Sequence, residues 1–155
     1  MITVLKFWRT AHSFSGFIRM ATCRSSLRSL DYVSFHKLLG TGKGETFTPS
    51  DADPYVWGII AVLPNASHVS KFEQSKPVRS FDEVAFQKTT IEMSTINSIG
   101  NWSGVQPFGA STGNIQNTVP IAAITRARLN WKYARRFWRE TPPVTASLHN
   151  APGLI

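Results

Sequence analysis

The stretch Tyr55–Leu63 reads YVWGIIAVL and gives the clearest strand signal in the chain. It is almost entirely apolar, which is typical of a central strand covered on both faces. Ile2–Trp8 is a second apolar run with β-branched and aromatic members, and it also predicts a strand. These two runs predict that a sheet forms the centre of the fold.

Helices and further strands are predicted around these two runs. Ser13–Leu30 places its apolar residues largely at three- and four-residue steps, which predicts an amphipathic helix. Tyr32–Leu39 predicts a strand that is broken by the glycines of residues 40–44. A short helix is expected over His68–Ser75, and one or two strands over Phe81–Ile99. The resulting order, β-α-β-β-α-β, is that of a ferredoxin-like α+β domain.

The rest of the chain predicts a loop and then a partial duplication. Residues 101–118 are rich in Gly, Ser, Asn and Thr, and a loop of this length is typical of a functional segment or a linker. Val119–Leu129 predicts a strand, and Trp131–Asn150 predicts a helix interrupted at Pro142-Pro143. This order of strand and basic helix repeats the start of the chain. We therefore expect three parts: a ferredoxin-like α/β repeat (1–100), an aromatic-bearing loop (101–118) and the start of a second, incomplete repeat (119–155).

Size and composition are those of a folded protein. The 155 residues suffice for one compact domain, or for one domain and an unfinished piece of another. No apolar run approaches the roughly 20 residues that span a bilayer, because Lys6, Arg9 and Arg19 interrupt the first segment. No secretory signal follows Met1. We expect a cytoplasmic protein, with peripheral membrane contact as an option.

The chain is strongly basic, with 17 Lys and Arg against 9 Asp and Glu and a net charge of +8. Such an excess indicates an anionic partner, either nucleic acid or a phospholipid surface. Met1–Leu30 and Arg126–Arg139 contain basic residues and no acidic residue. Because no recognised nucleic-acid motif accompanies them, membrane contact is favoured over nucleic acid, with a solvated helix face as the alternative. The residues predicted to contact a membrane or anion are Arg19, Arg135, Arg136 and Arg139.

Residues that could carry chemistry are sparse. The single Cys23 excludes an intramolecular disulfide and a multi-thiolate metal site. The four histidines are spread singly without metal-ligand spacing, so no metal site is predicted. His36, in a predicted strand among aromatic residues, is the best candidate for a cofactor ligand. Carboxylate pairs and nucleophile triads are absent from the sequence, and Gly40–Gly44 lacks the spacing of a phosphate-binding loop.

Aromatic residues are the most distinctive feature, with ten Phe, five Trp and three Tyr. Trp102 and Phe108 lie in the polar loop of residues 101–118, where an exposed aromatic side chain needs a reason. A loop that closes over a sheet and an apolar ligand would supply one. Two further candidates are Phe47 and Trp57, for which packing in the core is the favoured interpretation. The predicted substrate pocket therefore consists of Phe47, Trp57, Trp102 and Phe108.

Several motifs together resemble the spheroidene monooxygenase family of acyclic carotenoid ketolases. They follow the family's order over nearly the whole chain: FHKLLGTG (35–42), GETFTP (44–49), WSGVQPF (102–108), ITRA (124–127), FWR (137–139), PPV (142–144) and APGL (151–154). The resemblance implies an O2-dependent oxidoreductase that introduces a keto group into an acyclic carotenoid. It further implies a haem cofactor, a ferredoxin-type electron donor and a fold similar to the dimeric α/β-barrel oxygenases.

The sequence departs from the family pattern at two points. The family continues beyond Pro152-Gly153, so we expect a truncated, N-terminal part, whose activity and pairing as a homodimer stay open. His36 stands where the family usually shows an aromatic residue, so the resemblance does not carry a haem-ligand role to it; if the ligand lies in the missing half, this chain binds no haem. The alternative to an enzyme is a non-catalytic α/β-barrel module that binds an apolar ligand or an anionic membrane surface.

Overall fold

The computed structural model describes residues 1–43, 47–109, 120–126 and 129–148, with side chains described up to Pro143. The chain divides into two compact units. Unit 1 comprises Met1–Gly40 and Pro54–Ile121, and unit 2 comprises Thr41–Asp53 and Ala122–Ile155. Unit 1 holds most of the sheet and the helices packed on it, and unit 2 holds the C-terminal helix.

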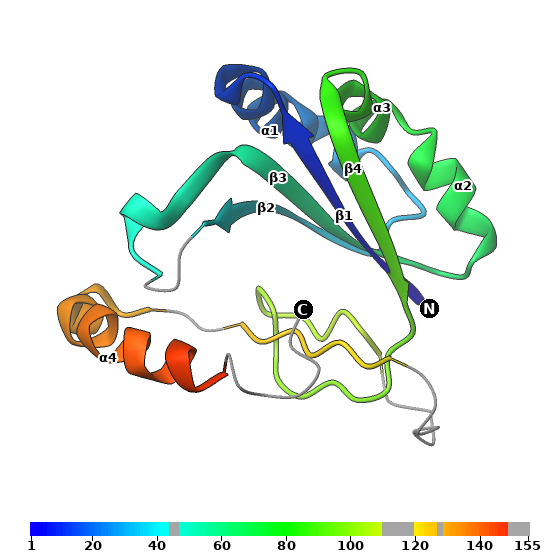
Figure 1. Cartoon of the computed structure of the whole chain (residues 1–155). Coiled ribbons are helices and arrows are strands. Elements are labelled where there is room, and N and C mark those ends of the chain that lie inside the picture. The colour runs from blue at the N-terminus through cyan, green and yellow to red at the C-terminus, as the bar shows by residue number, and fades with distance from the viewer. Residues whose placement is uncertain (44–46, 110–119, 127–128, 149–155) are drawn as a thin grey trace. The chain divides into compact units, whose positions relative to one another are not determined.

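Four strands form one sheet in the order β2-β3-β1-β4, and β1 pairs antiparallel with both β3 and β4. The helices α1, α2 and α3 all cover the same face of this sheet (Figure 1). This arrangement confirms the predicted ferredoxin-like α+β fold. The elements are β1 Ile2–Thr10, α1 Ser13–Arg28, β2 Phe35–Gly42, β3 Ala52–Leu63, α2 Ser67–Glu73, α3 Lys76–Asp82 and β4 Ala85–Met93.

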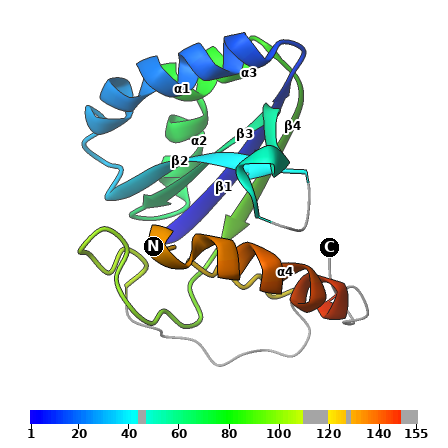
Figure 2. The same cartoon turned by 90° about the vertical axis from the view of Figure 1, so that its left-hand side faces the viewer.

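The core lies between the sheet and the helices because alternate strand residues point to that side. Val4 and Trp8 of β1 and Ile59 of β3 are buried there, and the Trp8 ring stacks on Phe81 of α3 with centroids 4.7 Å apart. Helices α1 and α3 lie side by side over this face (Figure 2). Burial of each large apolar side chain contributes about 1.5–3 kcal/mol, so this layer supplies most of the fold's stability.

A charged residue also points into this helix-covered face. Lys6 of β1 is only 3% exposed, and it forms ion pairs with Glu73 of α2 and, at 3.4 Å, with Asp82 of α3. The indole N–H of Trp8 donates a hydrogen bond to Asp82 at 2.7 Å. Because a buried charge is costly without a partner, these contacts fix both short helices against β1.

One helix replaces part of a predicted strand. Phe81, expected to begin a strand, lies in α3, and β4 begins only at Ala85. Pro77 in the first turn favours this helix, since a proline there loses no helical hydrogen bond. Val78 and Phe81, three residues apart, are both buried in the core. β2 also extends through Gly40 to Gly42, so the predicted break comes later than expected.

The C-terminal region differs from the prediction in two respects. Residues 120–126 and 129–130 form neither strand nor helix, so the strand expected over Val119–Leu129 is wrong for these residues, and residues 119, 127 and 128 lie outside the described part. Pro120, which has no N–H to donate, disfavours a strand there. The helix α4, Ala134–Leu148, runs through Pro142 and Pro143 without the expected interruption. The start of a second repeat stays a prediction.

Candidate functional site

The sheet face opposite α1, α2 and α3, here called the distal face, is apolar along its centre. Leu5 of β1 lies between Ile60 of β3 and Ile91 of β4 in one cross-strand row. In the neighbouring row Phe7 is paired with Gly58, and a Cβ placed on Gly58 would come within 2.8 Å of the Phe7 ring. Glycine therefore lets the ring of Phe7 lie directly over β3. Ile60 is buried on this face, so contact to an apolar molecule is offered by Ile91, which is 42% exposed, and by the half-buried Leu5 and Phe7.

Three aromatic rings meet at the β2 end of this face, and we call them the aromatic cluster. Phe35 begins β2, and the rings of Trp102 and Phe108 lie with their centroids 5.4 and 6.3 Å from its own. Trp102 and Phe108 are themselves 6.2 Å apart. Tilted and edge-to-face contacts at these distances are favourable for aromatic pairs. The structure thus brings together two of the four predicted pocket residues and adds Phe35, which the prediction missed.

A tight turn holds Trp102 in this cluster. Ser103 and Gly104 both have positive φ, 56° and 84°, as in the turns that close two-residue hairpins. The N–H of Trp102 donates to the carbonyl of Val105 at 2.7 Å, and the reverse bond measures 3.3 Å. The side-chain amide of Gln106 donates to the carbonyl of Ser98 at 3.2 Å. The loop is therefore ordered by its own backbone bonds around the aromatic side chain.

Trp57 does not join the aromatic cluster, because it points to the helix-covered face. It pairs with Trp8 across the sheet and packs against Gly16 of α1, where any Cβ would overlap the indole ring. Its indole N–H is buried and has no hydrogen-bond partner among the described residues. The alternative stated for Trp57, packing in the core, is the one that its position supports.

Phe47 belongs to unit 2, whereas the aromatic cluster belongs to unit 1. It is 67% exposed and has a φ of 54°. Within unit 2 its ring lies 6.4 Å from that of Phe137, and its carbonyl accepts a hydrogen bond from the Trp138 indole at 3.0 Å. These contacts join Phe47 to α4.

His36 follows Phe35 directly in β2, so the two side chains point to opposite faces of the sheet. His36 is half-buried beside α1. Burial lowers its pKa most, and neighbouring cations lower it further: Lys37, Arg28 and Arg24. A haem held on the distal face could not take His36 as its ligand.

The four predicted anion-contacting arginines divide between the two units. In unit 1 the guanidinium of Arg19 turns toward α3 and donates hydrogen bonds to the carbonyls of Ser80 and Ser15. In unit 2 Arg135, Arg136 and Arg139 are exposed on α4, and the last two lie 3.0 and 3.9 Å from a carboxylate oxygen of Glu140. Arg19 therefore contributes to helix packing rather than to an exposed basic surface.

Among the described residues, no three His, Cys, Asp or Glu side chains gather closely enough to hold a metal ion. No helix in the same ranges has both the length and the apolar character needed to cross a membrane.

Sequence comparison gives two curated relatives, while no family model matches the chain. The chain is 28% identical over 128 residues to the spheroidene monooxygenase of Cereibacter sphaeroides, covering 82% of this chain and 39% of that protein. It is 28% identical over 139 residues to the spheroidene monooxygenase of Rhodobacter capsulatus, covering 88% of this chain and 57% of that protein. The chain therefore spans well under two thirds of the length of these relatives.

Solved structures resemble part of this chain only distantly. An antibiotic biosynthesis monooxygenase gives a TM-score of 0.47 at 11% identity, covering 62% of this chain and 99% of its own. A dimeric ferredoxin-like protein of unknown function from Thermobifida fusca gives a TM-score of 0.44 at 6% identity. The match covers 59% of this chain and 88% of that protein. Over most of its own length, the chain is thus similar in sequence to the spheroidene monooxygenases, which confirms the resemblance that its motifs predict.

Proposed function

We propose that this chain forms the substrate-contacting ferredoxin-like part of an oxidoreductase that introduces a keto group into an acyclic carotenoid with O2. The observation that carries the proposal is the aromatic cluster of Phe35, Trp102 and Phe108 at the edge of an apolar sheet face. The similarity to two proteins named spheroidene monooxygenase supplies the reaction class.

The chemistry of the distal face matches a polyene substrate. A linear carotenoid is long and apolar, so its binding depends on contact area rather than on hydrogen bonds. Ile91, 42% exposed, and the half-buried Leu5 offer aliphatic contact along the sheet, and the aromatic cluster bounds this row at β2. Apolar pockets with few polar groups are typical of such ligands.

Oxidation of a C–H bond by O2 requires a cofactor, because amino-acid side chains do not activate O2. The resemblance implies haem, with a ferredoxin-type electron donor. The strand residues of the distal face include no His, Cys or Tyr among the described residues, and His36 lies on the opposite face. The described residues of the distal face do not fit a haem. We therefore assign no haem ligand in this chain and propose that the chain contributes substrate binding.

Carotenoid binding tests the contact surface directly. We expect an acyclic carotenoid in detergent micelles to quench tryptophan emission, and Trp102→Ala to weaken binding about tenfold, since roughly 1.4 kcal/mol of aromatic contact is lost. Trp131→Ala is the matched control, because Trp131 is 77% exposed and lies in unit 2. Equal affinity of the Trp102 variant and the wild-type protein would contradict the proposal.

A second candidate function is a non-catalytic module that binds an apolar ligand, and the poor fit of the distal face to haem favours it. Absorption spectroscopy after addition of haem separates the two functions. A Soret band together with ketone formation in the presence of ferredoxin and O2 supports the enzyme. Carotenoid binding without either signal supports the module. Sedimentation of the same samples tests whether the chain pairs as a homodimer.

A further inference from the structure

Helix α1 carries apolar side chains on two sides. One side is buried against the sheet through Gly16, Cys23 and Leu27. On the other side Phe14 and Phe17 are 71% and 61% exposed. A helix that is apolar on both sides normally has both covered, so the exposed side requires an explanation.

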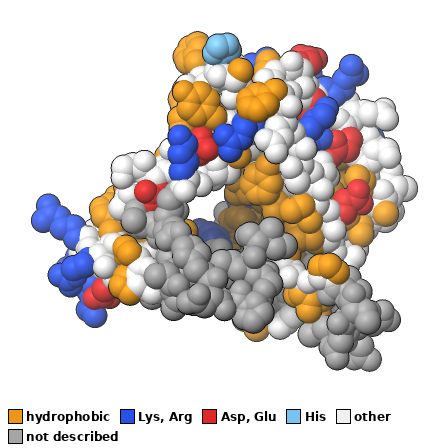
Figure 3. Space-filling view, viewed as in Figure 1, with side chains coloured by type: hydrophobic (Ala, Val, Ile, Leu, Met, Phe, Trp, Pro, Cys, Tyr) orange, Lys and Arg blue, Asp and Glu red, His pale blue; other side chains and the backbone are white. Residues whose placement is uncertain are grey.

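The exposed side continues as a basic surface along the same helix. Ile18, 41% exposed, extends the apolar part, and Arg24 and Arg28 follow about two and three turns later, both exposed. Helix α1 has no acidic residue. Figure 3 shows hydrophobic side chains at the top of the molecule, over α1, with Lys or Arg side chains nearby. We call this surface the outer stripe; it comprises Phe14, Phe17, Ile18, Arg24 and Arg28.

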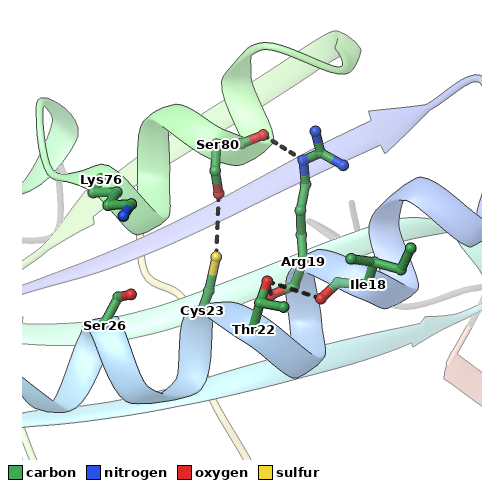
Figure 4. Close-up of a pocket in the computed structure, with 7 residues that line it drawn as sticks. All are labelled: Ile18, Arg19, Thr22, Cys23, Ser26, Lys76 and Ser80. Carbon is green, nitrogen blue, oxygen red and sulfur yellow. Dashed lines mark hydrogen bonds between the residues drawn. The ribbon is translucent and has the colours of Figure 1, made fainter.

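Two connected grooves border the outer stripe where α1 meets α2 and α3. The first, about 390 Å³, begins at Ile18 and lies between α1 and α3; Figure 4 shows Ser26 and Lys76 on its opposite walls. The second, about 560 Å³, shares Ser26 and Lys76 and adds Lys71. The ammonium of Lys71 lies 4.1 Å from the centre of the Tyr32 ring. Arg19, Lys71 and Lys76 line the grooves together with hydroxyl groups and no carboxylate.

We propose that the outer stripe and these grooves form a docking surface for an anionic lipid bilayer. Phe14, Phe17 and Ile18 enter the layer between headgroups and acyl chains, while lipid phosphates contact the cations beside them. Exposed aromatic residues beside Arg and Lys suit the headgroup layer of an anionic bilayer, because cations near its surface gain electrostatic attraction. Charge decides the partner, because the exposed acids nearby, Asp31 and Glu83, lie beyond the ends of α1 and α3.

The proposal concerns a different surface from the distal face. Docking through α1 leaves the aromatic cluster, on the opposite side of the sheet, free of the bilayer. Membrane binding and carotenoid binding can therefore fail independently, since their variants do not overlap.

Vesicle sedimentation tests the surface with the full chain. We expect binding to phosphatidylcholine vesicles that contain phosphatidylglycerol, little binding without it, and loss of binding as salt rises. Phe14→Ser with Phe17→Ser should reduce binding about tenfold or more. Phe86→Ser is the matched control, because Phe86 is 68% exposed on β4. Circular dichroism confirms that each variant is folded.

Charge removal gives an independent measurement. Lys71→Gln and Lys76→Gln should each weaken binding to the anionic vesicles about fivefold, whereas Lys88→Gln on β4 should leave it nearly unchanged. Three results would overturn the proposal: wild-type binding by the phenylalanine variant, loss of binding only when the α4 arginines are replaced, or a dimer in solution that the phenylalanine variant abolishes.

Discussion

The two faces of the sheet in unit 1 differ in how they combine apolar residues with charge. The helix-covered face includes Lys6, buried among Trp8, Glu73 and Asp82. The distal face has an aliphatic row through Leu5 and an aromatic cluster at its β2 end. One face thus fixes the fold through packing and paired charge, and the other carries an apolar row in which Ile60 is buried and Ile91 is 42% exposed.

The largest expected effect comes from matched isoleucines on the two faces. Ile59 is 2% exposed on the helix-covered face. Ile59→Ala should lower the free energy of unfolding by about 2–5 kcal/mol, because a cavity remains in the core. Ile91 is 42% exposed on the distal face. Ile91→Ala should lower the free energy of unfolding by less than about 1 kcal/mol and should instead weaken carotenoid binding. Urea unfolding and the quenching titration measure the two effects; equal losses of stability would remove the distinction between the faces.

A smaller effect, of opposite sign at two positions, is expected for glycines. Gly16→Ala should destabilise the protein by about 1 kcal/mol, because the new methyl group displaces the Trp57 indole and outweighs the gain in helix propensity. Gly40→Ala, in β2, should stabilise it by about 0.5 kcal/mol, because a Cβ there meets nothing within 4 Å. Thermal unfolding checks both. Stabilisation by Gly16→Ala would show that Trp57 does not depend on this close contact.

The smallest expected effect is the pH dependence contributed by His36. Its pKa is lowered in the folded protein, chiefly by burial, so folding favours the neutral imidazole. In the unfolded chain His36 has the ordinary histidine pKa of about 6.5, so the unfolded chain binds more protons than the folded protein below that pH. The stability contributed by neutral His36 therefore falls as pH decreases through that value. His36→Gln should lose less stability on acidification than the wild-type protein. His12→Gln, at an exposed position, should behave like the wild-type protein, and a reduced pH dependence there would contradict the assignment to His36.

The fold was predictable because its strands and first helix carry strong periodic signals. Tyr55–Leu63 and Ile2–Trp8 became adjacent antiparallel strands, as their composition indicated. Helix α3 was missed because a seven-residue helix contains too few turns for its period to stand out from a strand. The strand over Val119–Leu129 was inferred from apolar composition, which does not supply a neighbouring strand to pair with.

The candidate site was predictable only in part. Trp102 and Phe108 could be paired because both interrupt a polar loop, but their partner Phe35 depends on which way β2 faces. The faces of Trp57 and His36 could not be predicted for the same reason: strand alternation assigns neighbours to opposite faces, and only the completed sheet shows which face is which. Arg19 was misplaced because α1 is apolar on both sides, so its pattern does not identify the outward one.

The ion pairs of Lys6 have a consequence for strand alignment. If β1 slipped by one residue against its neighbours, every side chain would exchange faces. Lys6 would then leave its carboxylates for an aliphatic row, and Leu5 would take its place beside Glu73 and Asp82. Both changes are unfavourable, so a single ammonium group excludes the neighbouring register and gives the sheet one way to assemble.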